Sequence, residues 1–209
     1  EAHLGLWVTG KRVCGSWAHA DEDSSFCELN AYVQNIFARV GLTKNMMVVE
    51  TSDNNIFASG LKVMTRGGKT VAELGILSHK LQRAADIANP VYYADIHWNT
   101  LMKAVRKNKL EYQEISKYPA VSRDLALLID NSVKFAQIEE IAFQTEKKLL
   151  KRVELFDVYQ GKNLPEGKKS YAVNFIIQDA TRTLNDKAID AIMTKLINNI
   201  KNKLGAELR

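Results

Sequence analysis

A long hairpin in the last third of the sequence constrains the fold more than any other stretch. Residues 153–159 and 170–178 are rich in β-branched and aromatic residues and alternate in the way that is typical of strands. The loop between them contains Gly161, Pro165 and Gly167, residue types that end strands and form turns. Two strands joined in this way pair antiparallel, so the neighbouring segments are expected to extend a sheet.

The segments around the hairpin follow a known order of elements. Residues 123–130 alternate like a strand, and residues 135–149 and 189–204 repeat apolar side chains at helical spacing. Residues 206–209 are expected to form a short last strand. Strand, helix, strand, strand, helix, strand is the order of the ferredoxin-like βαββαβ sandwich, in which two helices cover one face of a four-stranded antiparallel sheet. The predicted fold class is α+β, and the other face of this sheet is predicted to be open.

Residues 1–107 predict a second, mainly antiparallel domain, joined by a linker over residues 108–117 to the domain of residues 118–209. A helix over residues 26–40 is expected to begin at Asp23 or Ser24 and to end at Gly41. The remaining expected elements are a hairpin of residues 5–10 and 13–18, strands over 46–51, 58–65, 70–78 and 91–98, and short helices after residues 78 and 98.

Composition and length exclude several classes of protein. A chain with 46% apolar residues, 25% charged residues and 3 prolines is typical of a globular protein. No apolar run approaches the roughly 20 residues of a membrane span, and no basic, apolar leader opens the chain, so a cytoplasmic location is expected. Glu1 falls inside an apparent strand pattern, which suggests a fragment of a longer protein.

The sequence predicts neither a catalytic site nor a metal site. Glycine loops of the forms GxxxxGK[ST] and GxGxxG are absent, and no Ser, His, Asp grouping stands out. Cys14 and Cys27 lack a CxxC partner. The histidines are scattered without a metal-ligand spacing. A binding role is therefore favoured over a chemical one.

The net charge of +5 is concentrated in the second half. Residues 1–115 hold 13 Lys and Arg against 12 Asp and Glu, whereas residues 116–209 hold 16 against 12. A surplus of cations suits a polyanionic partner, because neutralising phosphates releases counterions. A solvated basic surface explains the same counts, so this alternative stays open.

The open face of the predicted sheet supplies the candidate binding residues. Alternation along residues 170–178 turns Tyr171, Val173 and Phe175 toward the helices, which leaves a small and polar row on the open face. Exposed rings could stack bases at about 1–3 kcal/mol each, and basic side chains could hold the phosphates. The candidates for RNA contact are Arg123, Phe156, Tyr159, Lys168, Lys169, Ser170, Asn174 and Arg182.

Structural roles compete with these assignments. Phe156 could belong to the core instead of the surface. An ion pair at the strand entrance accounts equally well for Arg123. A carboxylate partner accounts for Arg182, where a phosphate is slightly favoured.

Motifs in both halves resemble one family. The runs LGLWVTGKRVCGSW, FCELNAYVQNIFARVGL and GGKTVAELGILSHKL are similar to the late part of the synthetase-like domain in the β subunit of bacterial phenylalanyl-tRNA synthetase. Asn30 departs from that family, which commonly carries a lysine at this position. Three later runs resemble the anticodon-binding domain of the same family, which has a ferredoxin-like fold. They are KYPAVSRDLALLID, VELFDVYQGKNLPEGKKSYAVNFIIQDATRTLNDKAID and KLGAELR.

The resemblance implies a division of roles within a larger enzyme. It implies that residues 1–107 are the C-terminal part of a class II synthetase-like domain without catalytic signatures, and that residues 118–209 bind the anticodon end of tRNA(Phe). The enzyme of this family is an α2β2 heterotetramer that uses ATP and Mg2+ at an active site in its α subunit, so no cofactor is expected in this chain. The editing site and the magnesium-associated segment are expected upstream of Glu1.

Two other functions stay open. A free-standing RNA-binding module explains the basic second half but assigns no role to residues 1–107. A ferredoxin-like regulatory domain that binds a small metabolite would show no salt-dependent affinity for RNA.

Overall fold

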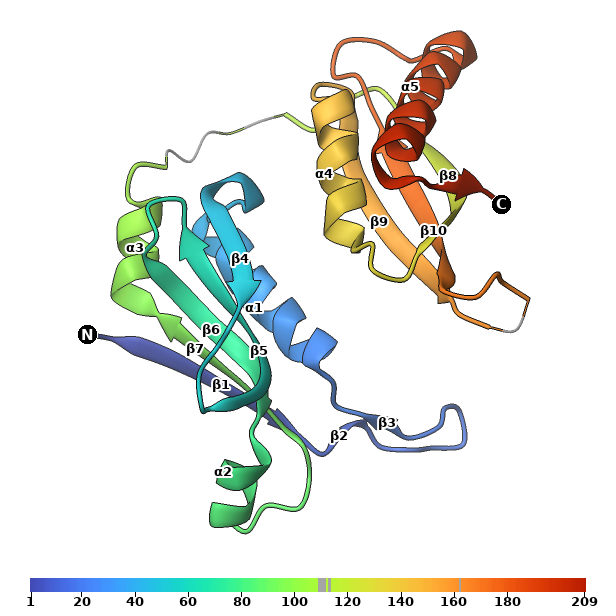
Figure 1. Cartoon of the computed structure of the whole chain (residues 1–209). Helices are drawn as coiled ribbons and strands as arrows, with labels where there is room; N and C mark the ends of the chain where they lie inside the picture. The colour runs from blue at the N-terminus through green and yellow to red at the C-terminus, as the bar shows by residue number, and fades with distance from the viewer. Residues whose placement is uncertain (109–111, 113, 162) are drawn as a thin grey trace. The chain divides into compact units, whose positions relative to one another are not determined.

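The chain forms two separate units. The computed structural model describes all residues except 109–111, 113 and 162. Unit 1 is Glu1–Glu111 and unit 2 is Tyr112–Arg209 (Figure 1). The boundary lies within the expected linker of residues 108–117, part of which falls outside the described residues.

Unit 1 is a five-stranded antiparallel sheet with helices on one face. The strand order is β1-β7-β6-β5-β4. Apolar residues of α1 and α3 meet those of the sheet in a single core, around Phe37, Leu74 and Ile96. The elements of unit 1 are β1 (His3–Thr9), β2 (Lys11–Val13), β3 (Glu22–Asp23), α1 (Phe26–Val40), η1 (Lys44–Met46), β4 (Met47–Thr51), β5 (Phe57–Thr65), β6 (Thr70–Leu77), α2 (His79–Ala84), β7 (Val91–His97) and α3 (Trp98–Val105).

The first helix of unit 1 has the predicted extent but a different N-cap. Ser25, rather than Asp23 or Ser24, accepts a hydrogen bond from the backbone N–H of Glu28 (3.3 Å). Gly41 ends the helix as predicted, with a φ of 85° that suits glycine. The apolar stripe of α1 is buried at Leu29, Val33 and Phe37, one turn apart.

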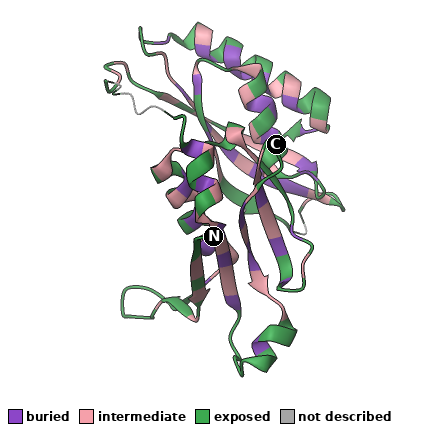
Figure 2. Cartoon of the chain, turned by 90° about the vertical axis from the view of Figure 1, so that its left-hand side faces the viewer, coloured by how far each residue is buried: buried purple, intermediate pink, exposed green. Residues whose placement is uncertain are grey.

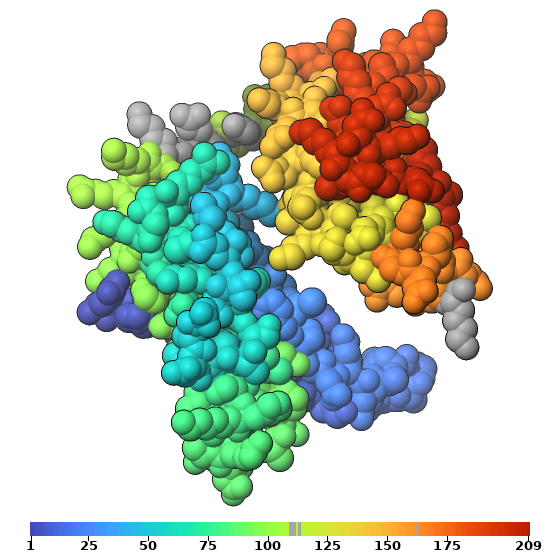
Figure 3. Space-filling model, viewed as in Figure 1, coloured from blue at the N-terminus to red at the C-terminus, as the bar shows by residue number. Residues whose placement is uncertain are grey.

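The expected hairpin of residues 5–10 and 13–18 is wrong. β1 pairs instead with β7, from His3 opposite His97 to Thr9 opposite Val91. β2 pairs with β3 in a small separate ribbon, and residues 11–23 project from the body of unit 1 (Figure 3). Pairing with β7 joins β1 to the main sheet, where Leu6 and Val8 pack against the core, and a local hairpin lacks this apolar contact.

Unit 2 has the predicted ferredoxin-like order of elements. Its antiparallel sheet runs β11-β8-β10-β9, and α4 and α5 lie on the same side of it (Figure 1). The elements are β8 (Val121–Asp130), α4 (Phe135–Thr145), β9 (Leu150–Tyr159), β10 (Lys168–Ile177), α5 (Asp186–Leu204) and β11 (Glu207–Leu208). The predicted α+β class is confirmed.

The core of unit 2 follows the predicted alternation. The inward row of β10 is buried under the helices, and buried and partly buried residues alternate from Tyr171 to Ile177. Figure 2 shows buried and exposed residues interspersed along the strands and helices of the chain. The row consists of Tyr171, Val173, Phe175 and Ile177. Helix α4 ends at Thr145 rather than Leu149, because the Glu146 carboxylate accepts the backbone N–H groups of Lys148 and Leu149 and turns the chain into β9.

Candidate nucleic-acid interface

Phe156 stands exposed on the edge strand of the unit 2 sheet. Its side chain is 59% exposed, which decides against core packing. The register of β9 against β10 shifts between Ala172 and Val173, so that Leu155 pairs with Val173 and Asp157 with Ala172. Phe156 is the extra residue of this β-bulge, and a bulge re-aims the side chain that it carries. An exposed ring on a rigid strand is a suitable platform for a flat ligand.

Tyr159 lies near the tip of the same strand and is partly exposed, at 37%. The guanidinium of Arg209 lies over its ring, with the Cζ atom 5.4 Å from the ring centroid. This distance is within the range of a cation–π contact, which holds the ring in place. Tyr159 pairs with Ser170 across the sheet and therefore belongs to the open face.

The central part of the open face is small and polar. Ala172, Asn174 and Ile176 form the outward row of β10, and all three are partly buried. The amide nitrogen of Asn174 donates to the hydroxyl of Ser122 and to the carboxylate of Asp124 on β8. These bonds fix the orientation of the Asn174 amide at the middle of the face.

Two candidate residues are buried, which corrects the sequence-based assignment. Ser170 is 6% exposed, because its small side chain lies between the larger cross-strand neighbours Leu128 and Tyr159. Lys169 is 7% exposed and belongs to the inward row with Tyr171. Its ammonium donates to the carbonyl of Asn131 (2.9 Å) and lies 4.7 Å from the centroid of the Tyr171 ring. Neither residue is available to a ligand in this conformation.

Lys168 remains at the surface and is paired. Its ammonium contacts a Glu207 carboxylate oxygen at 2.8 Å. The hydrogen bond from Lys168 is the main reason that the pKa of Glu207 lies below its ordinary value. Lys168 therefore supplies positive charge at the end of the sheet where β10 begins.

Arg123 and Arg182 lie at the opposite end of the sheet, near the start of α5. Arg123 contacts Asp186 at 3.6 Å, and Arg182 contacts Asp179 at 3.2 Å. The pKa of Asp179 is lowered, chiefly by hydrogen bonds from Thr181 and less by Arg182. The Arg182 side chain is nevertheless 74% exposed. Both arginines thus combine a structural ion pair with access to solvent.

The basic candidates do not converge on one side of the sheet. Lys168 pairs with Asp130 and Arg123 pairs with Phe175, seven residues away along the strands, which corresponds to about 23 Å. Between the two ends the face carries carboxylates, among them Asp124 and Asp157. Arg123 shares the inward row with the buried Phe175 and contacts Asp186 of α5, so it lies on the helix side of the sheet, and the expected basic border is reduced to Lys168 and Arg182.

Two residues of this face were missed by sequence reasoning. Asp157 is exposed and lies two positions before Tyr159, so alternation along β9 alone indicates its side. Arg209 is the last residue, and only the pairing of β11 with β8 brings it close to Tyr159. The alternation of β9 could therefore have identified Asp157 from the sequence, whereas no local pattern indicates Arg209.

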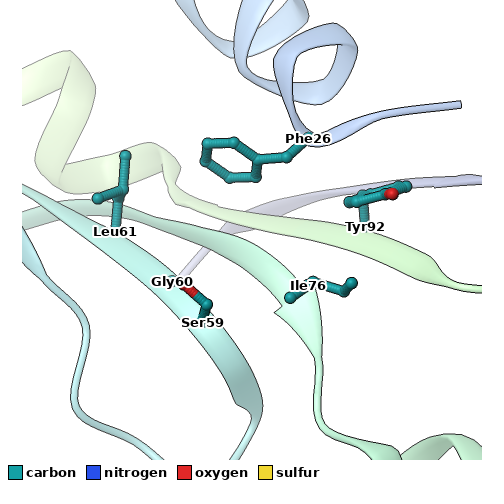
Figure 4. A pocket seen from close by; sticks show the side chains of 6 residues that line it. All are labelled: Phe26, Ser59, Gly60, Leu61, Ile76 and Tyr92. Carbon is teal, nitrogen blue, oxygen red and sulfur yellow. The ribbon is translucent and has the colours of Figure 1, made fainter. Parts of the chain in front are cut away.

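Unit 1 contains a pocket of a different character. Its volume is about 310 Å3, and it lies where the first turn of α1 faces strands β5, β6 and β7 (Figure 4). The lining residues are Phe26, Ser59, Gly60, Leu61, Ile76 and Tyr92. No charged side chain is among them, and the polar side-chain groups of the lining are the hydroxyls of Ser59 and Tyr92.

Two family models match the chain. Residues 116–209 match the ferredoxin-fold anticodon binding domain. Residues 1–98 match the phenylalanyl tRNA synthetase beta chain CLM domain. The two matches follow one another along the chain and leave only residues 99–115 uncovered.

Curated relatives match over the whole chain. A phenylalanine–tRNA ligase beta subunit of Bacteroides thetaiotaomicron is 61% identical over 209 residues, which is 100% of this chain and 26% of the relative. The proteins of the same name from Bacteroides fragilis and Porphyromonas gingivalis are 59% and 48% identical over 209 residues, which is again 100% of this chain and 26% of each relative. This chain spans about a quarter of the length of these relatives.

Proposed function

The chain belongs to the family of phenylalanyl-tRNA synthetase β chains, and from this we propose that unit 2 binds the anticodon end of tRNA(Phe) on the open face of its sheet. The exposed ring of Phe156 carries the proposal. A base stacks on such a ring, and the small outward row around Ala172 and Asn174 leaves room for a neighbouring base. Tyr159 offers a second ring on the same strand.

We assign phosphate contacts to the cations at the two ends of the face. These are Lys168 at one end and Arg182 at the other. Arg123 pairs across the strands with the buried Phe175 and lies on the helix side, so no phosphate contact is assigned to it. Exposed ion pairs contribute little stability, so exchanging a carboxylate for a phosphate costs little. The carboxylates between the two ends repel phosphates, and this favours bases rather than backbone over the centre of the face.

Asn174 and Asp124 are proposed to contact base edges. A carboxylate oxygen accepts from amino groups of bases, and an amide oxygen does the same. The hydrogen bonds from Asn174 to Ser122 and Asp124 hold these groups in fixed positions before any base arrives.

We extend the proposal to the whole protein because the relatives are named as ligase β subunits. In this proposal the protein is cytoplasmic, joins an α subunit in an α2β2 assembly, and takes part in the attachment of phenylalanine to tRNA(Phe). Unit 1 supports the assembly. No helix in the described part of the chain is long and apolar enough to cross a membrane.

ATP and Mg2+ belong to the reaction of the whole enzyme. The pocket of unit 1 does not fit them, because its lining is apolar apart from the hydroxyls of Ser59 and Tyr92. A triphosphate with its metal requires charged or backbone donors that converge on the phosphates. We therefore assign no step of the reaction to this chain.

Binding of an anticodon stem-loop tests the proposal. The chain is titrated at low salt with the stem-loop of tRNA(Phe) and with a stem-loop of scrambled loop sequence, using a filter assay. Tighter binding of the first is expected. Equal binding of both favours a general RNA-binding module, and binding of neither favours a metabolite-binding domain; either result contradicts anticodon recognition.

A further inference from the structure

Two histidines and two carboxylates gather on the open face of the unit 1 sheet. The rings of His3 and His97 lie with their centroids 4.6 Å apart. Ligand atoms of Glu1, His3 and His97 all lie within 4.8 Å of one another. Nδ1 of His3 lies 2.9 Å from a carboxylate oxygen of Asp95. No other group of this kind was found among the described residues.

The pairing of β1 with β7 assembles this cluster. His3 and His97 are direct cross-strand partners. Glu1 and Asp95 each lie two positions from one of the histidines, and side chains two positions apart in extended chain share a face. The Glu1 carboxylate is held in turn by the hydroxyl of Thr100, at 3.2 Å, in the first turn of α3.

Asp95 determines which nitrogen of His3 is available. A carboxylate only accepts hydrogen bonds, so the Nδ1 of a neutral His3 carries the proton that Asp95 accepts. The lone pair is then on Nε2. A carboxylate that orients a histidine in this way is the usual second partner of a metal-binding imidazole.

An aromatic wall borders the cluster. Gly5 lies between His3 and Trp7 on β1, and the six-membered ring of Trp7 lies so close over it that a Cβ at this position would meet the ring at 2.4 Å. Trp7 stacks on Tyr93 with the centroids 4.8 Å apart. These rings occupy the face beyond Gly5, whereas Glu1 and His3 remain exposed and open to an ion from solvent.

We propose that His3, His97 and Glu1 bind one divalent transition-metal ion, with Zn2+ the best match, and that Asp95 positions His3. Two imidazoles and a carboxylate are ligands that suit Zn2+. Tetrahedral ligation places ligand atoms about 3.3 Å apart, so the side chains have to close by only about 1 to 1.5 Å. Three protein ligands leave a fourth position for water. The ion would fasten the edge strand β1 to β7.

Zinc titration of the whole 209-residue chain tests this site. The chain is treated with EDTA, freed of chelator and titrated with ZnCl2 by calorimetry in a background where Cys14 and Cys27, both exposed and free, are changed to serine. One equivalent is expected to bind. The double change His3→Ala and His97→Ala is expected to weaken binding at least about 100-fold, and Asp95→Asn about 10-fold.

His79→Ala is the matched control, because His79 is an exposed histidine of unit 1 outside the cluster. It is expected to leave zinc affinity unchanged. Titration with Co2+ of the chain that retains its cysteines adds a spectroscopic reading, since thiolate ligation produces a near-ultraviolet charge-transfer band that imidazole ligation lacks. Undiminished zinc affinity in the double histidine variant would overturn the proposal, as would loss of affinity in His79→Ala alone. Circular dichroism of the variants separates lost ligands from lost folding.

Discussion

The open faces of the two sheets differ in how their aromatic rings are arranged. In unit 1 the rings of Trp7, Tyr93 and Phe57 stack in sequence, with centroid separations of 4.8 and 6.2 Å. In unit 2 the ring of Phe156 stands on an edge strand and is 59% exposed. Within the unit 1 stack the exposed fraction falls from 64% at Trp7, on the edge strand β1, to 8% at Phe57, on the interior strand β5. Phe57 and Phe156 are the same residue type and differ widely in exposure, so the exposure of a ring depends on its strand and register.

Glycines explain why the rings of unit 1 lie flat. A Cβ at Gly60 would meet the Phe57 ring at 2.9 Å, and Gly75, the cross-strand partner of Gly60, is also in close contact with that ring. The corresponding central row of unit 2 has Ala172 and Asn174, which keep their side chains. The rings of unit 1 therefore fill the space above bare backbone, whereas the row of unit 2 stays open.

The largest expected effect comes from adding a side chain at Gly75, one of the two glycines that lie against the Phe57 ring in unit 1. Gly75→Val places a Cβ 2.4 Å from the carbonyl oxygen of Ser59 and 2.7 Å from the Cα of Gly60, and both are backbone atoms that cannot simply rotate away. We expect the free energy of unfolding of unit 1 to fall by about 2–3 kcal/mol. Tryptophan fluorescence during urea unfolding measures this, because all three tryptophans lie in unit 1.

Ala172→Val is the matched change in unit 2. It adds two methyl groups to an open, partly exposed position, and we expect the stability of unit 2 to change by less than about 0.5 kcal/mol. Similar losses of unfolding free energy from Gly75→Val and Ala172→Val would show that the two faces are equally packed.

Removing the exposed ring of unit 2 is expected to weaken RNA binding. Phe156→Ala should cost about 1–3 kcal/mol of binding free energy for the anticodon stem-loop, a loss of about 5- to 150-fold in affinity. Phe156→Trp should retain the affinity, because it keeps a ring at the bulge. Trp7→Ala removes an exposed ring from the other unit, so binding should be unchanged; a loss there equal to that of Phe156→Ala would mean that both faces contact the RNA.

A smaller effect is expected from the cations at the end of the unit 2 face. Arg182→Ala should weaken binding of the stem-loop modestly and reduce the slope of log K against log [salt] by about 1, since one phosphate contact is lost. Filter binding at several salt concentrations measures the slope.

Lys169→Ala is the control for that experiment. Its ammonium is buried against Asn131 and Tyr171, so this change should lower the stability of unit 2 and leave the slope unaltered. If Lys169→Ala reduced the slope of log K against log [salt] and Arg182→Ala left it unchanged, the roles assigned to the two residues would be reversed.

The smallest expected effect is a difference in pH response between the units. In unit 2 the pKa of Glu207 is lowered, chiefly by the hydrogen bond from Lys168. The stability from this pair is present above the ordinary Glu value of 4.5 and is lost as pH falls through the folded pKa. In unit 1 burial, and secondarily Asp95, raises the pKa of Tyr93 above its ordinary value of 10.0, so that stability is lost as pH rises through the folded value.

Acid should thus affect unit 2 first and alkali unit 1. Amide NMR signals of unit 2 measure its unfolding as pH falls, and tryptophan fluorescence measures the unfolding of unit 1 as pH rises. Glu207→Gln should reduce the acid sensitivity of unit 2 without altering the alkaline response of unit 1. An unchanged loss of unit 2 stability at low pH in this variant, compared with the original chain, would contradict the expectation.

Local patterns predicted most of the fold. The alternation at Tyr171, Val173 and Phe175 identified the buried row of β10, because period two is a property of any strand. Helical spacing identified the buried stripe of α1, and Gly41 its end. The initial hairpin was predicted wrongly, because the same alternation fits a strand paired with a neighbour in sequence and one paired with β7.

The candidate site was less predictable than the fold. Ser170 has the predicted outward direction, yet it is covered by Leu128 and Tyr159, whose positions depend on the register of both neighbouring strands. The assignment of Lys169 to the open face fails because this residue belongs to the inward row. The contacts assigned to Phe156, Asn174 and Arg182 stay predictions.

The sequence by itself determined the family, the order of elements in unit 2, and the buried stripes of β10 and α1, because motifs and apolar periodicity are local properties of a chain. Only the tertiary structure decided that a bulge exposes Phe156, that the cations separate to the two ends of the sheet, and that His3 meets His97. These features depend on strand register. Register is set by the sum of contacts between segments distant in the chain, and no local pattern contains that sum.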